Sequence, residues 1–157
     1  MNGLAYYSSP VGELEIQSQQ DAITLVGFLR ALKRSEHHTP VIQTCIRELD
    51  EYFFKGRKSF EVRIELRGSA FQQSVWNKLL EIPYGKTTYY ADIASKVGDL
   101  NAVRAVGLAN GQNPIVIIVP CHRVIGKDGS LVGYGGGLER KIWLLRHEGA
   151  FNQLDLF

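Results

Sequence analysis

The residues that flank Cys121 are of the types that can make a cysteine thiol reactive. Cys121 follows the β-branched run of residues 115–119 and a proline, and it precedes His122 and Arg123. The thiolate is the nucleophilic form of cysteine, and a nearby histidine or positive charge lowers the thiol pKa toward neutrality. A random Cys-His pair is more often a core cysteine beside a surface histidine. The proline, the arginine and the glycine-rich stretch 133–137 favour a nucleophile in a pocket.

His122 is the candidate base for this thiol. Neighbours on an extended strand point to opposite faces, so Cys121 and His122 can cooperate only in a turn or through a bridging water, and we expect the water. A histidine base also needs an acceptor that orients its second ring nitrogen. Glu148 is the candidate acceptor, because a carboxylate at the C-terminal end of a helix stands against the preference of the helix dipole.

The second cysteine, Cys45, lies on the apolar side of a predicted helix, and we expect a buried core residue. The absence of a Cys-x-x-Cys or Cys/His spacing argues against a disulfide framework and against zinc, so we expect no metal and no cofactor. We find neither a signal-peptide pattern nor a run of about 18 apolar residues, and we expect a cytoplasmic protein without membrane contact. A net charge of +2 neither indicates nor excludes nucleic acid.

The elements that must position these residues fall into two parts. Apolar alternation broken by turn residues from Leu4 to Leu29 predicts a small antiparallel sheet. Thr39-Pro40 opens a helix that runs to about Phe54, and residues 62–66 alternate as a further strand. A boundary near Gly68 gives an N-terminal α/β lobe, residues 1–67, and a second domain, residues 68–157.

The second domain is expected to be mainly helical, which makes the fold class α+β. Its expected elements are a helix over residues 71–80, short helices over 90–97 and 101–110, a buried strand over 115–119, and a helix over 138–147. The two short helices are joined by a Gly98-Asp99 turn, and they form a helix-turn-helix candidate.

The pentapeptide Pro120-Cys121-His122-Arg123-Val124 resembles the signature of the O6-alkylguanine-DNA alkyltransferases. The resemblance extends from about Phe71 to Gly149, and its other segments are residues 71–76, 82–87, 104–107, 110–114 and 143–149. A fainter likeness at residues 9–14 reaches into the N-terminal lobe. The family implies a ribonuclease H-like lobe followed by a winged-helix-like domain that contains the helix-turn-helix.

The resemblance implies DNA repair by direct reversal of damage. O6-alkylguanine, with O4-alkylthymine as an expected second substrate, would be flipped out of the duplex, at a cost of a few kcal/mol that is smaller for a damaged base. The alkyl group would pass irreversibly to Cys121. A thioether is not reduced by cellular thiols, so the protein would act once, as a single-turnover methylated-DNA–protein-cysteine methyltransferase.

The resemblance also implies the catalytic roles. Cys121 would be the alkyl acceptor, His122 the water-mediated base and Glu148 the residue that orients the histidine. Asn113 would be the hinge between the recognition helix and the active-site strand.

The same resemblance implies how the flipped base is bound. Tyr90 would donate a hydrogen bond to it, and the carbonyls of Cys121 and Val124 would accept from the guanine amino group. Tyr134 would line the pocket mouth, and the backbone N–H of Gly135 would bind O6. Some relatives have serine at position 135. Because the expected donor is the backbone N–H, glycine at this position should still bind O6.

Double-stranded DNA carrying the alkylated base is the implied partner, contacted by a monomer in the minor groove. Arg104 would enter the stack where the target nucleotide has left. Small residues on the same helix, Ala102, Ala105 and Gly107, would let its backbone approach the DNA closely.

Two other functions fit parts of the pattern. A cysteine hydrolase would use the thiol on an acyl carbon, but no oxyanion-hole sequence is recognisable. A non-catalytic winged-helix DNA-binding protein would use the helix-turn-helix, but it leaves Cys121, His122 and Glu148 without a purpose.

Overall fold

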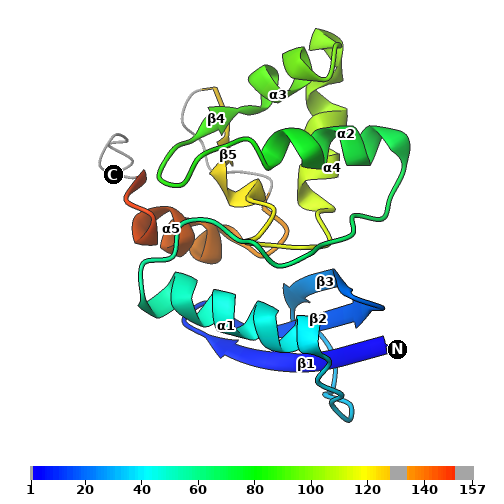
Figure 1. Cartoon of the computed structure of the whole chain (residues 1–157). Helices are drawn as coiled ribbons and strands as arrows, with labels where there is room; N and C mark the ends of the chain where they lie inside the picture. Colours follow the sequence, from blue (N-terminus) through cyan, green and yellow to red (C-terminus); the bar gives the residue numbers. More distant parts are fainter. Residues whose placement is uncertain (1, 128–133, 151–157) are drawn as a thin grey trace. The chain divides into compact units, whose positions relative to one another are not determined.

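The computed structural model describes residues 2–127 and 134–150 (Figure 1). The chain forms two compact units, one of Met1–Arg67 with Pro114–Ile118, the other of Gly68–Asn113 with Val119–Phe157. The expected division after residue 67 differs from these units at Pro114–Ile118, which the sequence pattern assigns to the second domain. Within the described residues, none of the helices has the length and apolar character needed to cross a bilayer.

The first unit contains the predicted antiparallel sheet. Strands β1 (Asn2–Ser9), β2 (Gly12–Gln19) and β3 (Ala22–Phe28) are ordered β1-β2-β3. Alternate residues point to one face, and Leu14 and Ile16 on β2 are fully buried there. The prediction of a small sheet between residues 4 and 29 is therefore confirmed.

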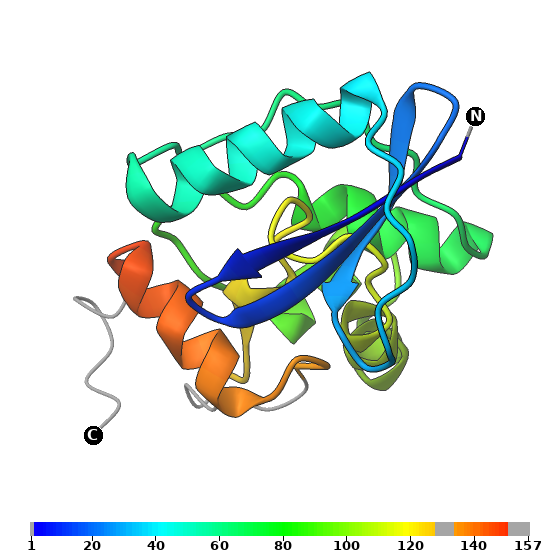
Figure 2. The same cartoon turned by 90° about the horizontal axis from the view of Figure 1, so that it is seen from below.

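Helix α1 (Pro40–Phe54) packs on this sheet, as Figure 2 shows. It begins as the sequence predicts: the Thr39 side chain accepts from the backbone N–H of Ile42, and proline occupies the first turn. Cys45 is buried on its apolar face, and burial raises the pKa of its thiol to about 12. This cysteine is the inert core residue that its position predicts.

Two segments expected as strands pair with β3 through isolated bridges rather than as continuous strands. Ile64 lies parallel to Ile23, and Ile115 lies parallel to Val26. The expected strand over 115–119 is wrong beyond the first residues, because Ile117 has a φ of 73° and the Ile118 N–H donates to the Val116 carbonyl at 2.8 Å. The apolar run predicted burial correctly, but it could not predict this turn.

The second unit holds the remaining helices. They are α2 (Ala70–Leu79), α3 (Tyr90–Lys96), α4 (Val103–Gly111) and α5 (Leu138–His147), with the short η1 (Leu100–Ala102) before α4. Strands β4 (Thr88–Tyr89) and β5 (Val124–Ile125) pair in parallel. Gly98 takes a φ of 93° between α3 and η1, and Asp99 caps η1, so the predicted helix-turn-helix is present.

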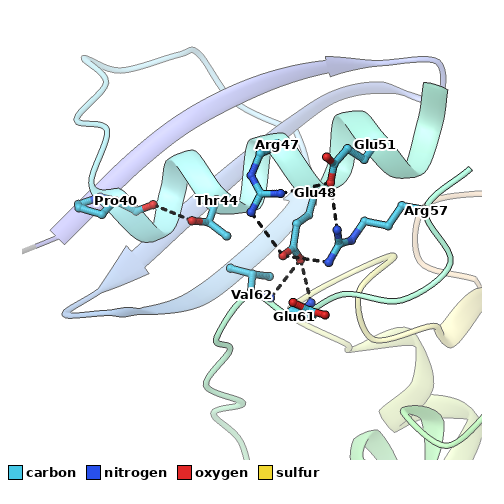
Figure 3. Close-up of polar contacts among 8 residues, drawn as sticks. All are labelled: Pro40, Thr44, Arg47, Glu48, Glu51, Arg57, Glu61 and Val62. Carbon is cyan, nitrogen blue, oxygen red and sulfur yellow. Dashed lines mark hydrogen bonds and ion pairs between the residues drawn. The ribbon is translucent and has the colours of Figure 1, made fainter. Parts of the chain in front are cut away.

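A buried ion-pair cluster holds the segment after α1 in the first unit (Figure 3). Glu48, 2% exposed, accepts from the backbone N–H groups of Glu61 at 2.9 Å and Val62 at 3.0 Å. Its other oxygen lies 3.1 Å from the Arg57 guanidinium, which also pairs with Glu51. Both oxygens of this carboxylate face donors, which is the condition for a buried charge to be tolerated.

Replacing Glu48 with alanine should lower the free energy of unfolding by about 3–5 kcal/mol, because Arg57 and two backbone N–H groups would lose their buried partner. Urea unfolding of the whole chain measures the loss. The matched control is Glu65→Ala, since the Glu65–Arg67 pair is half exposed and should contribute at most about 1 kcal/mol. Equal losses in the two variants would contradict a structural role for the Glu48 cluster.

Candidate active site

Cys121, His122 and Arg123 form a single turn of 3-10 helix, here called the Cys-His turn. It begins after Pro120, and the N–H of Val124 closes it by donating to the Cys121 carbonyl. All three residues of the turn are buried. The extended geometry expected from the sequence is therefore wrong at this point, because the chain turns here. The water-mediated route between Cys121 and His122 stays a prediction.

A three-residue network surrounds the histidine. His122 Nε2 lies 2.7 Å from Glu148 Oε2, and both side chains are fully buried. Arg123 donates from Nε to Glu148 Oε1 at 2.7 Å and from a terminal nitrogen to Oε2 at 3.1 Å. Its other terminal nitrogen donates to the Ile82 carbonyl at 2.7 Å. The structure thus brings Glu148 and His122 together and adds Arg123, which the sequence singled out as a positive charge near the thiol but not as a partner of Glu148.

The charges in this network follow from its contacts. Burial alone would raise the pKa of Glu148, but His122 and Arg123 outweigh it and hold that pKa well below its ordinary range. Burial lowers the pKa of His122, and the cations of Arg123 and Lys141 add to that effect against the attraction of Glu148. The resting state is therefore an ionised carboxylate beside a neutral imidazole.

The contact with Glu148 selects one tautomer of the neutral His122 imidazole. Since Nε2 faces an acceptor, it carries the ring proton, and Nδ1 keeps its lone pair. Nδ1 is buried and has no hydrogen-bond partner among the described residues. His122 is therefore held as a base whose free nitrogen is Nδ1.

The thiol needs such a base. Burial raises the pKa of Cys121 to about 11, against a hydrogen bond from the Asn113 side chain and the charge of Lys141, which both lower it. Asn113 also donates from Nδ2 to the Val119 carbonyl at 2.7 Å. Asn113 therefore contacts the residues on both sides of Pro120, and its role as a hinge stays a prediction.

Lys141 is a site residue that sequence reasoning missed. It is completely buried on α5, its Nζ donates to the Val124 carbonyl at 2.6 Å, and it lies 5.8 Å from the centre of the Tyr90 ring. Burial lowers its pKa to about 8. The signal available was its helical spacing to Leu144 and Leu145, which puts a lysine on the buried face of an amphipathic helix.

Two tyrosines lie near the thiol. Tyr90 begins α3 and Tyr134 precedes α5; both are buried, and the pKa of each is raised first by burial and then by the charge of Cys121. Gly135 follows at an exposed position, where an added Cβ would meet the Gly111 carbonyl at 2.9 Å. Residue 133, the first of the expected glycine-rich stretch, lies outside the described residues.

Helix α4, the second helix of the helix-turn-helix, and the residue before it carry the expected DNA-contacting residues at exposed or partly exposed positions. Arg104 and Ala105 are exposed, Ala102 and Gly107 are partly exposed, and Val106 on the opposite face is fully buried. A Cβ added at Gly107 would meet nothing within 4 Å. The exposed part of α4 therefore carries one arginine and small residues, together with the exposed apolar side chains of Val103 and Leu108.

No group of His, Cys, Asp and Glu side chains in residues 2–127 and 134–150 is arranged to hold a metal ion.

Comparisons with known proteins match both units of the chain. Residues 4–66 match the family model described as "6-O-methylguanine DNA methyltransferase, ribonuclease-like domain", and residues 70–150 match its "DNA binding domain". A methylated-DNA–protein-cysteine methyltransferase of Methanosarcina acetivorans is 43% identical over 152 residues, which are 93% of this chain and 97% of the relative.

Solved structures agree with these matches. The crystal structure of a Mycobacterium tuberculosis O6-methylguanine methyltransferase matches with a TM-score of 0.86 at 42% identity, covering 96% of this chain and 94% of that one. The M. tuberculosis protein OGT in complex with DNA matches with a TM-score of 0.85 at 44% identity, covering 92% and 91% of the two chains.

Lys141→Met should raise the pKa of Cys121 above its value of about 11, because the nearby cation that favours the thiolate is lost. The rate of alkylation by iodoacetamide near neutral pH, where Lys141 with its pKa of about 8 still carries its charge, should then shift to lower values, with about tenfold less thiolate for each pKa unit. Lys127→Met is the control, since this lysine is exposed. A shift of equal size in both variants would contradict the role assigned to Lys141.

Proposed function

Because the chain belongs to the 6-O-methylguanine DNA methyltransferase family, we propose that Cys121 is the residue that accepts the alkyl group. The activity itself is DNA repair by transfer of an alkyl group to a protein cysteine. The observation that carries the assignment is the buried turn that joins the thiol of Cys121 to the His122–Glu148–Arg123 network.

The transfer step uses the groups of this turn. The thiol proton passes to His122 Nδ1 through a bridging water, and the sulfur attacks the alkyl carbon of the damaged base. The S–C bond forms as the C–O6 bond breaks, and the electron pair of the broken bond stays with the guanine. The Tyr90 hydroxyl donates a proton to the leaving guanine, and Tyr90 regains a proton from the His122 imidazolium through water, so the thiol proton ends on guanine. Glu148 stays ionised throughout and stabilises the imidazolium that forms on His122.

The pocket binds the base through main-chain and tyrosine groups. The carbonyls of Cys121 and Val124 accept from the guanine amino group, and the backbone N–H of Gly135 donates to O6. Tyr134 lines the mouth of the pocket. O4-alkylthymine lacks the amino group, and it is the weaker of the two substrates that we propose.

Access to O6 requires the base to leave the duplex. Arg104, exposed on α4, fills the vacated space, while Ala102, Ala105 and Gly107 allow the helix to lie close to the minor groove. The protein acts as a monomer in the cytoplasm. A reducing compartment suits its cysteines, both of which are free.

Incubation with an excess of an O6-methylguanine oligonucleotide should add one methyl group per protein molecule, at Cys121 and nowhere else. A methylated Cys121 has no S–H proton to lose and cannot form the thiolate again, and neither a base nor a cation in the site could remove the methyl group. Intact mass and peptide mapping measure the product. Continued turnover, or methylation at another residue, would refute the proposed function.

Cys121→Ala and Cys45→Ala are the matched controls for that experiment. Cys121→Ala should lose transfer and still bind alkylated DNA, because recognition resides in α4 and the pocket. Cys45→Ala should keep transfer and lose only stability, since this thiol is buried in the core of the first unit.

Arg104→Ala should slow transfer from duplex DNA, because the cost of unstacking the target base is no longer offset by an inserted side chain. The rate should fall about tenfold for each 1.4 kcal/mol of lost stabilisation. Free O6-benzylguanine needs no extrusion and should react with Cys121 at nearly the parental rate.

The control for Arg104 is Lys96→Ala, which removes an exposed cation from α3 and should weaken duplex binding only through charge. Equal slowing of the duplex and the free base by Arg104→Ala would mean that Arg104 supports the fold or the site.

A further inference from the structure

Asn110 is a buried polar residue that the transfer step does not use. It lies in the last turn of α4 and is 1% exposed, whereas the next residues, Gly111 and Gln112, are exposed. Asparagine is seldom fully buried and is disfavoured inside helices, where its side chain competes for backbone hydrogen bonds. Its burial at this place therefore requires a specific partner.

That partner is the Cys-His turn. Asn110 Nδ2 donates to the Cys121 carbonyl at 3.3 Å. The orientation of the amide is fixed by chemistry, because a carbonyl oxygen can only accept and the amide nitrogen must face it. Asn113, three residues further on, holds the Val119 carbonyl in the same manner. Asn110 and Asn113 thus bind a carbonyl within the turn, that of Cys121, and a carbonyl before it, that of Val119.

The other atom of the same amide has no such partner. Asn110 Oδ1 is buried and has no hydrogen-bond partner among the described residues. A buried acceptor without a donor destabilises the folded state, whereas leucine would fill a similar volume without that cost. Stability of the fold therefore does not explain asparagine here, and exceptions of this kind concentrate at functional sites.

We propose that Asn110 is a positioning residue that aims the Cys121 carbonyl at the amino group of the flipped guanine. The inference rests on the proposed function, in which the carbonyls of Cys121 and Val124 accept that group. Each of the two carbonyls has a buried side-chain donor, Asn110 for one and Lys141 for the other. These donors fix the direction of the carbonyls before the base arrives, so the amino group meets acceptors that need no reorganisation.

The length of the contact supports an orienting role. The Cys121 carbonyl already accepts from the Val124 N–H that closes the turn. At 3.3 Å the Asn110 contact is longer than the usual N–H···O distance of about 2.9–3.0 Å. Because both lone pairs of this oxygen already face a donor, the amino group can be accepted only by sharing the oxygen with the long Asn110 contact.

The test compares two free bases that differ only in the amino group, O6-benzylguanine and O6-benzylhypoxanthine. The parent protein should react faster with the guanine, because only that base satisfies both carbonyls. In Asn110→Leu, the rate of thioether formation at Cys121 should fall roughly tenfold or more with O6-benzylguanine and less than about threefold with O6-benzylhypoxanthine. The melting temperature should not fall, since the variant removes an unpartnered buried acceptor.

Gln112→Leu is the matched control, because it alters an exposed residue just beyond α4 and should leave the ratio of the two rates unchanged. The proposal would be overturned if Asn110→Leu slowed the reactions with the two bases equally. It would also be overturned if the variant lowered the melting temperature and reduced both rates. If the leucine variant does not fold, Asn110→Asp keeps the shape without the donor: a lower ratio supports the proposal and an unchanged ratio overturns it.

The parent protein separates failure of the inference from failure of the proposed function. A parent that gains no mass on Cys121 from either base or from alkylated DNA contradicts the proposed function. A parent that reacts equally fast with the two bases leaves alkyl transfer intact and overturns the role of Asn110.

Discussion

The site depends on one buried carboxylate. Glu148 accepts from His122 and from two nitrogens of Arg123, and Arg123 extends the network to the Ile82 carbonyl. A buried carboxylate is tolerated only when opposite charge and hydrogen bonds offset its desolvation, and apolar replacements of such networks are often as stable. The network is therefore better explained by the chemistry of the histidine than by stability. It fixes which ring nitrogen of His122 holds the proton and which one is free.

The same burial protects the thiol. A pKa of about 11 keeps Cys121 protonated and weakly nucleophilic near neutral pH. A protein that can use its cysteine once would be inactivated by any other electrophile that met a free thiolate. In the proposed function, His122 as the proton acceptor and Lys141 as a nearby cation would activate the buried thiol when the alkylated guanine binds. Burial of the thiol leaves the resting protein inert.

The sequence predicted the elements whose signals are local. Thr39-Pro40 marks the start of α1 and Gly98 marks the turn before the recognition helix, because caps and positive φ depend on a few adjacent residues. The turn at Ile117 carries no such signal, since an isoleucine with positive φ is held there by its surroundings. Lys141 and Asn110 were missed for a related reason. Their types predict exposure, and only the fold supplies the carbonyls that bury them.

Gly135 lies against the end of α4, the helix whose last turn contains Asn110. A Cβ there would meet the Gly111 carbonyl at 2.9 Å, closer than real contacts allow, and the obstacle is backbone at the end of α4. Serine at this position would therefore need the end of that helix to move. Since Asn110 and Asn113 hold the Cys-His turn from the same helix end, such a movement would reach Cys121. Gly135 thus permits a close approach of two backbones at the end of the helix that carries Asn110.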